Sequence, residues 1–357
     1  MMRSLSFNEG WQFRRIALDG EKDAPFKAVA LPHDAMIGET RSPQAVSAQN
    51  SGWFEGRDYE YVKTWTPSEE LEGKSLLLEF EGVYHLAQVW IDGKLVAERP
   101  YGYTNFYVDL AGLVEPGRPC ELRVVAKNSD QPNSRWYSGA GIYRPVTLWV
   151  GEPVHLLPSG IAARTLSLDG SSARVEVSLE ASGSGLATVE LLPEGSQEPV
   201  ATGHVELGAD GSGSAVLEVP QPRTWSPDHP DLYLCRVDLA AGGDAVDHGE
   251  TLFGIRTLEW GDDGLLLNGD RIVLRGACIH HDNGVLGACA FADAEWRKVL
   301  LMREQGYNAV RSAHNPCSKA LLDACDHLGV LVMDEYVDHW YIHKTLHDYV
   351  EYFDAWW

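Results

Sequence analysis

Polar and ionisable side chains follow three short apolar runs in the last quarter of the sequence. His280 ends the first run, Arg311 and His314 lie at the end of the second, and Asp334 and Glu335 end the third. A histidine can donate or accept hydrogen bonds near neutral pH, because its ordinary pKa is about 6.5. An arginine keeps a neighbouring carboxylate ionised through charge-assisted hydrogen bonds. A lone histidine at a strand end is more often structural, but three such ends together favour a functional site.

The segments that carry these residues alternate between strand and helix. We expect strands at residues 272–279, 308–314 and 330–333, with a helix between each pair. Strand–helix–strand units build a parallel sheet, and in a (β/α)₈ barrel the carboxyl ends of the strands hold the active site. Arg311 and His314 lie three positions apart and cannot both point inward from one ideal strand. One of them is therefore expected on the loop that follows.

Both expected helices have recognisable ends. The first is predicted to have Asp293 as its N-cap and to end before Gly306, and the second to open at Asn315-Pro316 and to end at Gly329. Their apolar stripes are Trp296, Val299 and Leu300 in the first helix and Leu321, Leu322, Cys325 and Leu328 in the second. These stripes predict the faces that pack against the sheet.

The first 260 residues show the pattern of strands and turns. Apolar runs flank Asp92 and Gly93, and this pair is a strong signal for a type I′ hairpin. Residues 173–180 alternate between apolar and polar, which predicts a half-buried strand. Aromatic residues are frequent before residue 150 and scarce at 160–220. We therefore expect two β-sandwiches joined by a connector at 151–160, the second of immunoglobulin-like size.

Composition narrows the class of protein. With 52 acidic and 29 basic residues the net charge is −23, which argues against nucleic acid and anionic membrane surfaces as partners. No run of 18 apolar residues occurs, and the N-terminal MMRSLSFNEGWQF lacks the apolar core of a secretory leader. Six scattered cysteines without a CxxC pair predict buried, reduced thiols in a cytoplasmic protein. A chain of 357 residues is expected to form two or three domains.

Several motifs, in order along the whole chain, resemble those of glycoside hydrolase family 2, the β-galactosidase type. In the last third these are LRGACIHHDNGVLGA (274–288), NAVRSAHNP (308–316) and LLDACDHLGVLVMDE (321–335). Earlier motifs are LPHD (31–34), YEYVKTW (59–65), VWIDGKLV (89–96), SGAGIYRPVTL (138–148), WSPDHPDLY (225–233) and FGIR (253–256). The resemblance implies a sugar-binding jelly-roll sandwich at 1–152, an immunoglobulin-like sandwich at 153–258, and the first part of a TIM-barrel catalytic domain at 259–357.

The resemblance also implies an activity. Family members of this type hydrolyse terminal β-glycosidic bonds, here most simply β-galactosides, by a retaining double displacement; β-glucuronides are the runner-up substrate. A carbohydrate substrate and a homo-oligomer are therefore expected. Mg²⁺ is implied near the acid/base of the complete enzyme, with ligands downstream, and we expect no cofactor or metal in this chain. The substrate-binding residues implied or proposed are His280, Arg311, His314, Asp130, Glu335 and Trp340.

In that resemblance His280 and His314 contact the sugar, Arg311 supports the nucleophilic carboxylate, and Asp130 reaches a sugar hydroxyl from the first sandwich. One of Asp334 and Glu335 is expected to line the pocket or to brace Arg311, with Glu335 as the candidate, and Trp340, beyond the third strand, is expected to stack on a sugar face. Adjacent strand residues face opposite ways, so Asp334 and Glu335 cannot form the pair of carboxylates, about 5 Å apart, of a retaining enzyme.

Both catalytic glutamates of the family come from later strands, and the acid/base follows an asparagine. The only Asn-Glu pair here is Asn8-Glu9, so we expect residues 1–357 alone to be inactive. A non-catalytic carbohydrate-binding or interaction module is the alternative. His339, His343 and His347 recur every four residues, which on a helix would form one face; a metal site there is the weaker interpretation, and an aromatic segment flanking the pocket is favoured.

Overall fold

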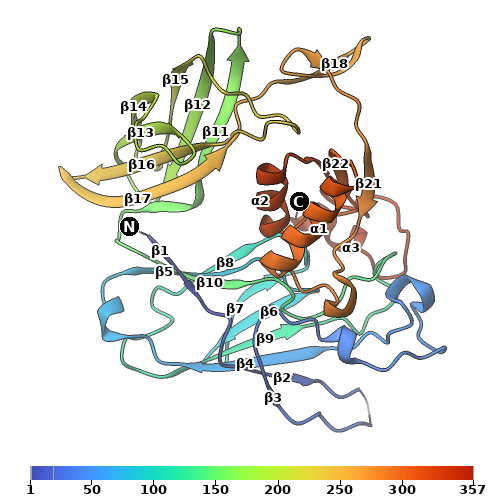
Figure 1. Ribbon diagram of the computed structural model, residues 1–357. Coiled ribbons are helices and arrows are strands. Elements are labelled where there is room, and N and C mark those ends of the chain that lie inside the picture. The colour runs from blue at the N-terminus through green and yellow to red at the C-terminus, as the bar shows by residue number, and fades with distance from the viewer. Residues whose placement is uncertain (1, 19, 357) are drawn as a thin grey trace.

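A computed structural model describes residues 2–18 and 20–356 as three packed parts (Figure 1). The first part is a sandwich of two antiparallel sheets, with strand orders β1-β10-β5-β8 and β3-β2-β4-β9-β6-β7. Its strands are β1 (Arg3–Ser6), β2 (Trp11–Arg15), β3 (Lys27–Val29), β4 (Tyr59–Trp65), β5 (Ser75–Phe80), β6 (Ala87–Ile91), β7 (Lys94–Arg99), β8 (Phe106–Asp109), β9 (Cys120–Ala126) and β10 (Val146–Gly151). Alternate residues of facing strands, such as Tyr61, Leu78 and Leu122, are fully buried between the sheets.

The hairpin between β6 and β7 turns at Asp92 and Gly93, as predicted. Both residues have positive φ, 47° and 78°, which is the backbone that a type I′ turn requires. Asp92 also accepts a hydrogen bond from the backbone N–H of Glu121 on neighbouring β9, at 2.8 Å. The turn thereby helps to fix the register of β6 against β9.

The second part is a smaller sandwich of the immunoglobulin-like kind. Its sheets have orders β11-β12-β15 and β14-β13-β16-β17. The strands are β11 (Leu156–Leu168), β12 (Ser172–Ala181), β13 (Gly185–Pro193), β14 (Ala201–Leu207), β15 (Ser212–Pro220), β16 (Tyr233–Ala241) and β17 (Asp244–Phe253). Ala173, Val175, Val177 and Leu179 of β12 are buried while their neighbours are not, so the alternation predicted there is confirmed.

The third part begins with an exposed hairpin, β18 (Leu258–Gly261), β19 (Gly264–Leu267) and β20 (Asp270–Arg271), and continues as a parallel sheet. That sheet has the order β21-β22-β23, with β21 (Gly276–Ile279), β22 (Ala309–Ser312) and β23 (Leu331–Asp334). The helices are α1 (Ala292–Glu304), α2 (Lys319–Leu328) and α3 (Val350–Trp356). The chain thus runs β21-α1-β22-α2-β23, which is the opening of a (β/α)₈ barrel.

Both helix starts differ from their predictions. Phe291 occupies the N-cap of α1, so Asp293 lies inside the first turn, where its charge suits the helix dipole. Helix α2 starts at Lys319, three residues later than Asn315-Pro316 suggested, because the hydroxyl of Ser318 accepts a hydrogen bond from the N–H of Leu321 and caps it. Gly329 ends α2 in the left-handed conformation, as predicted.

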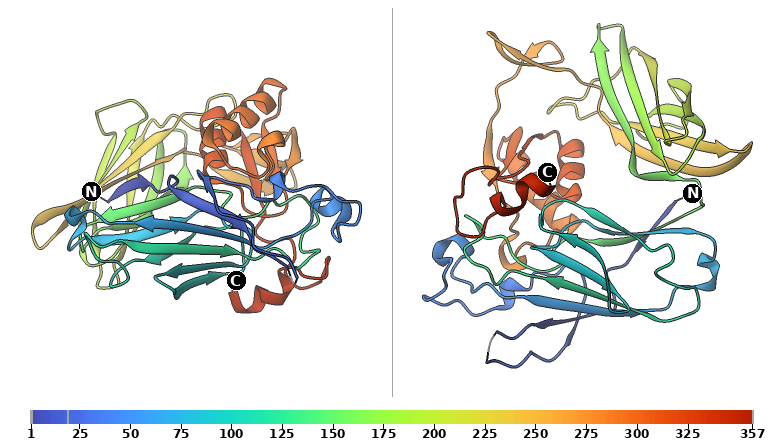
Figure 2. Two further views of the ribbon diagram at one scale, coloured as in Figure 1. Left: turned by 90° about the horizontal axis from the view of Figure 1, so that it is seen from below. Right: turned by 180° about the vertical axis from the view of Figure 1, so that it is seen from behind.

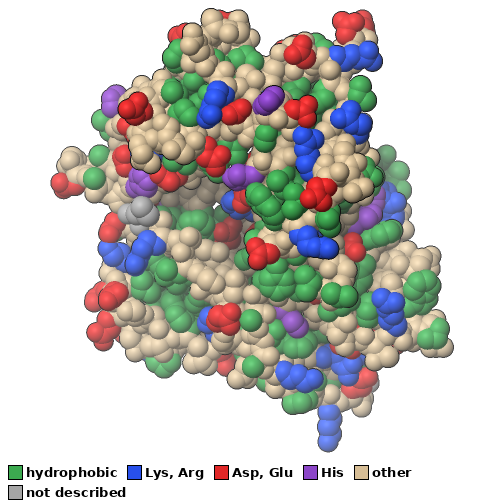
Figure 3. Space-filling model, viewed as in Figure 1, with side chains coloured by type: hydrophobic (Ala, Val, Ile, Leu, Met, Phe, Trp, Pro, Cys, Tyr) green, Lys and Arg blue, Asp and Glu red, His purple; other side chains and the backbone are tan. Residues whose placement is uncertain are grey.

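Only part of each predicted apolar stripe is buried. Val299, Leu321 and Cys325 are buried between the helices and the sheet, whereas Trp296, Leu300 and Leu322 are more than a third exposed. Figure 3 shows hydrophobic side chains gathered on the surface of the region where Figure 1 places α1 and α2. In the described residues, no helix is long and apolar enough to cross a membrane.

The third part packs directly on the first through a buried carboxylate. Asp34, only 2% exposed, accepts hydrogen bonds from the hydroxyl of Tyr137 and from the backbone N–H groups of Ala140 and Ala288. A Cβ at Gly287 would lie 2.2 Å from Oδ2 of Asp34, so no larger residue fits there. Figure 2 shows the red C-terminal segment beside the first sandwich as well. The barrel strands are therefore held in place against the loops of the sandwich.

Candidate functional site

The polar residues predicted at three strand ends do meet at one edge of the parallel sheet. Ile279 of β21 pairs with Ser312 of β22, and Ser312 pairs with Asp334 of β23, so the three carboxyl ends are level. His280 follows β21 directly. Arg311 lies within β22, whereas His314 lies two residues beyond it. The prediction that one of these two residues belongs to the loop is confirmed.

Arg311, Glu335 and His314 form one hydrogen-bonded and ion-paired group. Nε and Nη2 of Arg311 both donate to Oε1 of Glu335, with the Nε distance 2.8 Å. Nδ1 of His314 lies 3.3 Å from the other carboxylate oxygen. Hydrogen bonds to Cys278 and Glu335 raise the pKa of Arg311 above its usual value, so the guanidinium stays charged. Glu335 therefore braces Arg311, which is one of the two roles predicted for it.

The carboxylate of Asp334, the residue before Glu335, has a structural role. Oδ1 of Asp334 accepts a hydrogen bond from the backbone N–H of Cys317, just before α2. Asp334 and Glu335 therefore have different surroundings, as adjacent strand residues must. Cys278 corrects the prediction that all six cysteines are buried: it is exposed, because residues 276–278 of edge strand β21 have no covering layer, and its Sγ accepts a hydrogen bond from Arg311.

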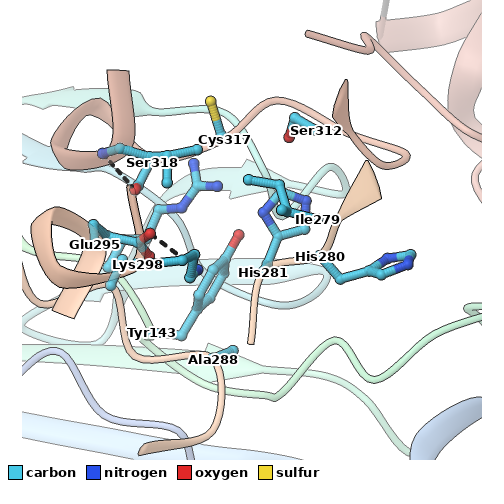
Figure 4. Close-up of a pocket in the computed structure, with 13 residues that line it drawn as sticks. Tyr143, Ile279, His280, His281, Ala288, Glu295, Lys298, Ser312, Cys317 and Ser318 are labelled. Atoms are coloured by element: carbon cyan, nitrogen blue, oxygen red, sulfur yellow. Dashed lines mark hydrogen bonds and ion pairs between the residues drawn. The ribbon is translucent and has the colours of Figure 1, made fainter. Parts of the chain in front are cut away.

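The two adjacent histidines after β21 point in different directions (Figure 4). His280 stacks on the indole of Trp136, with ring centroids 3.9 Å apart and 12° between the planes, and meets the ring of His314 edge-on at 5.5 Å. His281 turns inward against Tyr103, at 4.7 Å, and its Nε2 is buried without a hydrogen-bond partner among the described residues. Desolvation, with smaller contributions from neighbouring histidine, arginine and lysine side chains, lowers the pKa of both. Both rings are therefore neutral at pH 7.

A cavity of about 510 Å³ opens in front of Arg311, His314 and Glu335. Sequence reasoning missed three of the residues around it. Arg135 and Asp338 line the cavity, whereas Trp136 stacks on His280, whose ring meets that of the cavity-lining His314. These residues come from different parts of the fold, and no local pattern links residues about 200 positions apart.

Asp338 is the most strongly paired carboxylate at the cavity. It accepts two hydrogen bonds from Arg135, at 2.9 and 2.6 Å, and one from Nζ of Lys344 at 2.8 Å, and it lies 2.6 Å from Nε2 of His339. Although desolvation opposes them, His339, Arg135 and Lys344 hold the pKa of Asp338 well below its usual range. The carboxylate is therefore charged at every physiological pH and can accept hydrogen bonds.

Of the two remaining predicted residues, Trp340 lines the cavity and Asp130 does not. Trp340 lines the cavity and is half exposed, so its ring is accessible to a ligand. Asp130 is exposed and does not line the cavity; its backbone carbonyl accepts a hydrogen bond from Asn133. A sugar contact by Asp130 stays a prediction. The segment that carries Trp340 is irregular up to α3, which begins at Val350.

The three spaced histidines therefore do not share a helix face. His339 and His343 both lie 2.9 Å from the carboxylate of Asp348, whereas His347 faces Glu351 at 3.5 Å. Within residues 2–18 and 20–356, no group of three histidine, cysteine or acidic side chains is arranged to hold a metal ion. The arrangement at the cavity is instead one of fixed donors, fixed acceptors and aromatic rings, which suits a polyhydroxylated ligand.

Three domain families match the chain in order. Residues 30–144 match the glycosyl hydrolase 2 galactose-binding domain-like family, residues 161–256 match glycosyl hydrolases family 2, and residues 258–344 match its TIM barrel domain. The chain is 35% identical over 365 residues to the β-galactosidase BoGH2A of Bacteroides ovatus, and 32% identical over 368 residues to a putative β-glucuronidase of Formosa agariphila. These matches cover 98% and 99% of this chain but 43% and 35% of the relatives.

Solved structures give the same assignment. A family 2 glycosyl hydrolase from Bacteroides cellulosilyticus superposes with a TM-score of 0.91 at 33% identity, over 99% of this chain and 48% of that one. A β-glycosidase from Bacteroides vulgatus does so with a TM-score of 0.91 at 31% identity, over 99% of this chain and 47% of that one. The chain thus spans less than half the length of these relatives. With all three parts of the fold matched in family order, the chain belongs to glycoside hydrolase family 2.

Proposed function

We propose that the protein to which these residues belong hydrolyses terminal β-galactosides by a retaining double displacement, with this chain forming one wall of the sugar pocket. The observation that carries the proposal is the group formed by Arg311, Glu335 and His314 at level strand ends, with His280 beside it. Fixed charged donors and acceptors of this kind recognise hydroxyl groups in defined positions. An aromatic ring at the same cavity, Trp340, suits the apolar face of a sugar.

Charge pairing supports a neutral sugar. Arg311 is neutralised by Glu335, and Asp338 is shared between Arg135 and Lys344. A cation that already has a carboxylate partner gains less from a second one. A neutral glycoside such as methyl β-galactoside is therefore expected to bind better than methyl β-glucuronide.

A second candidate, action on β-glucuronides, has one observation in its favour. Three cationic side chains line the cavity, Arg135, Arg311 and Lys344, against the two carboxylates of Glu335 and Asp338. One positive charge is thus in excess, in a chain whose net charge is −23. A putative β-glucuronidase is also among the relatives.

The chain itself is proposed to bind sugar without turning it over. Glu335 is engaged by Arg311 and Asp334 by the start of α2, so neither is placed as an attacking carboxylate or a free general acid. Residues 1–357 are titrated with methyl β-galactoside, methyl β-glucuronide and methyl β-mannoside by calorimetry, and incubated with the corresponding nitrophenyl glycosides. We expect the galactoside to bind best and no nitrophenol release above the buffer rate.

Three binding results would contradict this proposal. Failure of all three methyl glycosides to bind would contradict a sugar pocket, equal binding of the three would contradict the preference for galactoside, and tighter binding of the glucuronide would favour the second candidate. An Arg311→Ala variant is expected to lose binding, and Lys319→Ala, which removes a cation exposed on α2, is the matched control that should keep it. Turnover by residues 1–357 would show that a catalytic pair exists among them.

A further inference from the structure

A short loop of the first sandwich reaches the cavity and is pinned at both of its ends. At one end, the buried side chain of Asn133 donates to His85 and accepts from the hydroxyl of Tyr84, at 2.8 and 3.0 Å. At the other end, the hydroxyl of Tyr137 donates to Asp34 at 2.6 Å. The residues between these two anchors therefore have a fixed position relative to the barrel strands.

Between the anchors, Arg135 connects the loop to the barrel. Its guanidinium donates from Nε and Nη2 to the two oxygens of Asp338, a bidentate geometry that fixes orientation as well as distance. Asp338 is only 11% exposed at its side chain, so this pair is less screened than a surface ion pair. The contact holds the next residue, Trp136, above the strand end that carries His280.

Trp136 presents a large aromatic surface at this place. One face of the indole stacks on His280, yet the residue as a whole is 50% exposed. Among the described residues its Nε1 forms no hydrogen bond; only the backbone of Trp136 is bonded, to the hydroxyl of Ser134. An exposed indole with a free N–H donor and a fixed ring plane is suited to a ligand that has an apolar face and hydroxyl groups at its edge.

We propose that Trp136 is a stacking platform for a second pyranose ring, next to the sugar held by His280, His314 and Arg311, and that Arg135 and Asp338 are positioning residues for it. This inference rests on the proposed function. The platform adjoins the first sugar's position, because the indole of Trp136 stacks on His280, whose ring meets that of His314 edge-on at 5.5 Å. A disaccharide enters with one ring in the cavity and the other against the indole.

The test compares lactose with methyl β-galactoside as ligands of residues 1–357. The indole N–H signal of Trp136 in ¹⁵N-resolved spectra is assigned by its loss in Trp136→Phe. We expect lactose, and not methyl β-galactoside, to shift this signal strongly. In Trp136→Ala the affinity for lactose should fall by about tenfold, while that for methyl β-galactoside changes less than twofold. Trp260→Ala removes a 78% exposed tryptophan from the distant β18 hairpin and should change neither.

The positioning role of Arg135 is tested by lactose affinity together with the indole N–H signal of Trp136. Arg135→Ala should weaken lactose binding and move the Trp136 signal in the unliganded chain, whereas Arg135→Lys should restore part of both. Unchanged lactose affinity in Trp136→Ala, with methyl β-galactoside still bound by the unsubstituted chain, would overturn the platform and leave the proposed function standing. Failure of the unsubstituted chain to bind either sugar would overturn both. An equal loss for both ligands would show that Trp136 only shields His280, which also overturns the inference.

Discussion

Glu335 accepts two hydrogen bonds from Arg311 on one carboxylate oxygen and faces Nδ1 of His314 with the other. The three residues come from two different strand ends, so this contact ties β22 to β23 at the edge of the cavity that all three line. Ion pairs this exposed contribute little to folding, because solvent screens them. The group therefore serves to orient donors rather than to hold the sheet together.

Replacement of Glu335 by Gln tests that distinction. The amide keeps the shape but loses the charge that holds the Arg311 guanidinium and the His314 ring, so the affinity for methyl β-galactoside should fall by about tenfold. The free energy of unfolding should change by less than about 1 kcal/mol. Calorimetric titration and urea unfolding measure the two effects. Asp323→Asn, which breaks the exposed pair with Lys319 on α2, is the matched control. A large loss of stability with sugar binding intact would contradict the orienting role.

Cys278 offers a chemical probe of the same site. It is the exposed cysteine, and its sulfur lies 3.2 Å from Nη1 of Arg311. Burial raises the pKa of Cys235, Cys289 and Cys317 to about 12, so their thiolates are scarce at neutral pH. We expect a disulfide reagent to modify one thiol in the folded chain and all six after denaturation. Cys278→Ser should remove the reactive thiol, and methyl β-galactoside should slow its modification. Reaction of several thiols at similar rates would argue against the packing described here.

The sequence predicted the elements whose signal is local. The turn at Asp92-Gly93 and the alternation in β12 depend on neighbouring residues, and both are confirmed. The helix starts were misplaced because a hydroxyl at Ser318 and the backbone at Phe291 decided them, against two plausible competitors, Asn315-Pro316 and Asp293. Capping depends on the geometry of one residue, which a pattern of side-chain types does not contain.

The site was predictable to the extent that it sits on strand ends. Parallel strands bring their carboxyl ends to one edge, and this rule alone predicts that His280, Arg311 and Glu335 lie together. Trp136 and Arg135 could not be found in this way, because Arg135 meets Asp338 across 203 positions and between two parts of the fold. In the sequence, Arg135 and Trp136 are a cation next to an aromatic residue, in a loop held at both ends by hydrogen bonds. This pattern indicates a site only once the surface that carries Asp338 is known to face the loop.

The cap of α2 gives a test of local stability. The Oγ of Ser318, a residue only 3% exposed, accepts the hydrogen bond from Leu321 that begins the helix. Ser318→Ala removes it and should cost about 1 kcal/mol, whereas Ser318→Thr, which keeps a capping hydroxyl, should cost less. Urea unfolding monitored by circular dichroism measures both. Ser171→Ala, in an exposed turn of the second sandwich, is the control. Equal stability of Ser318→Ala and the unsubstituted chain would mean that the cap is dispensable.

Buried neutral histidines make the first sandwich sensitive to acid. Burial lowers the pKa of His33 to about 4, and burial together with the charge of His347 lowers that of His85 to about 3. In the unfolded chain both have a pKa near 6.5, so below pH 6.5 the unfolded state binds protons first and stability falls as the pH falls. Between pH 7 and pH 5 each should contribute a loss of about 2 kcal/mol. His33→Gln or His85→Gln should flatten the pH dependence of the urea midpoint, while exposed His229→Gln should leave it unchanged. The same pH dependence in His33→Gln, in His85→Gln and in the unsubstituted chain would contradict the burial of these two rings as neutral groups.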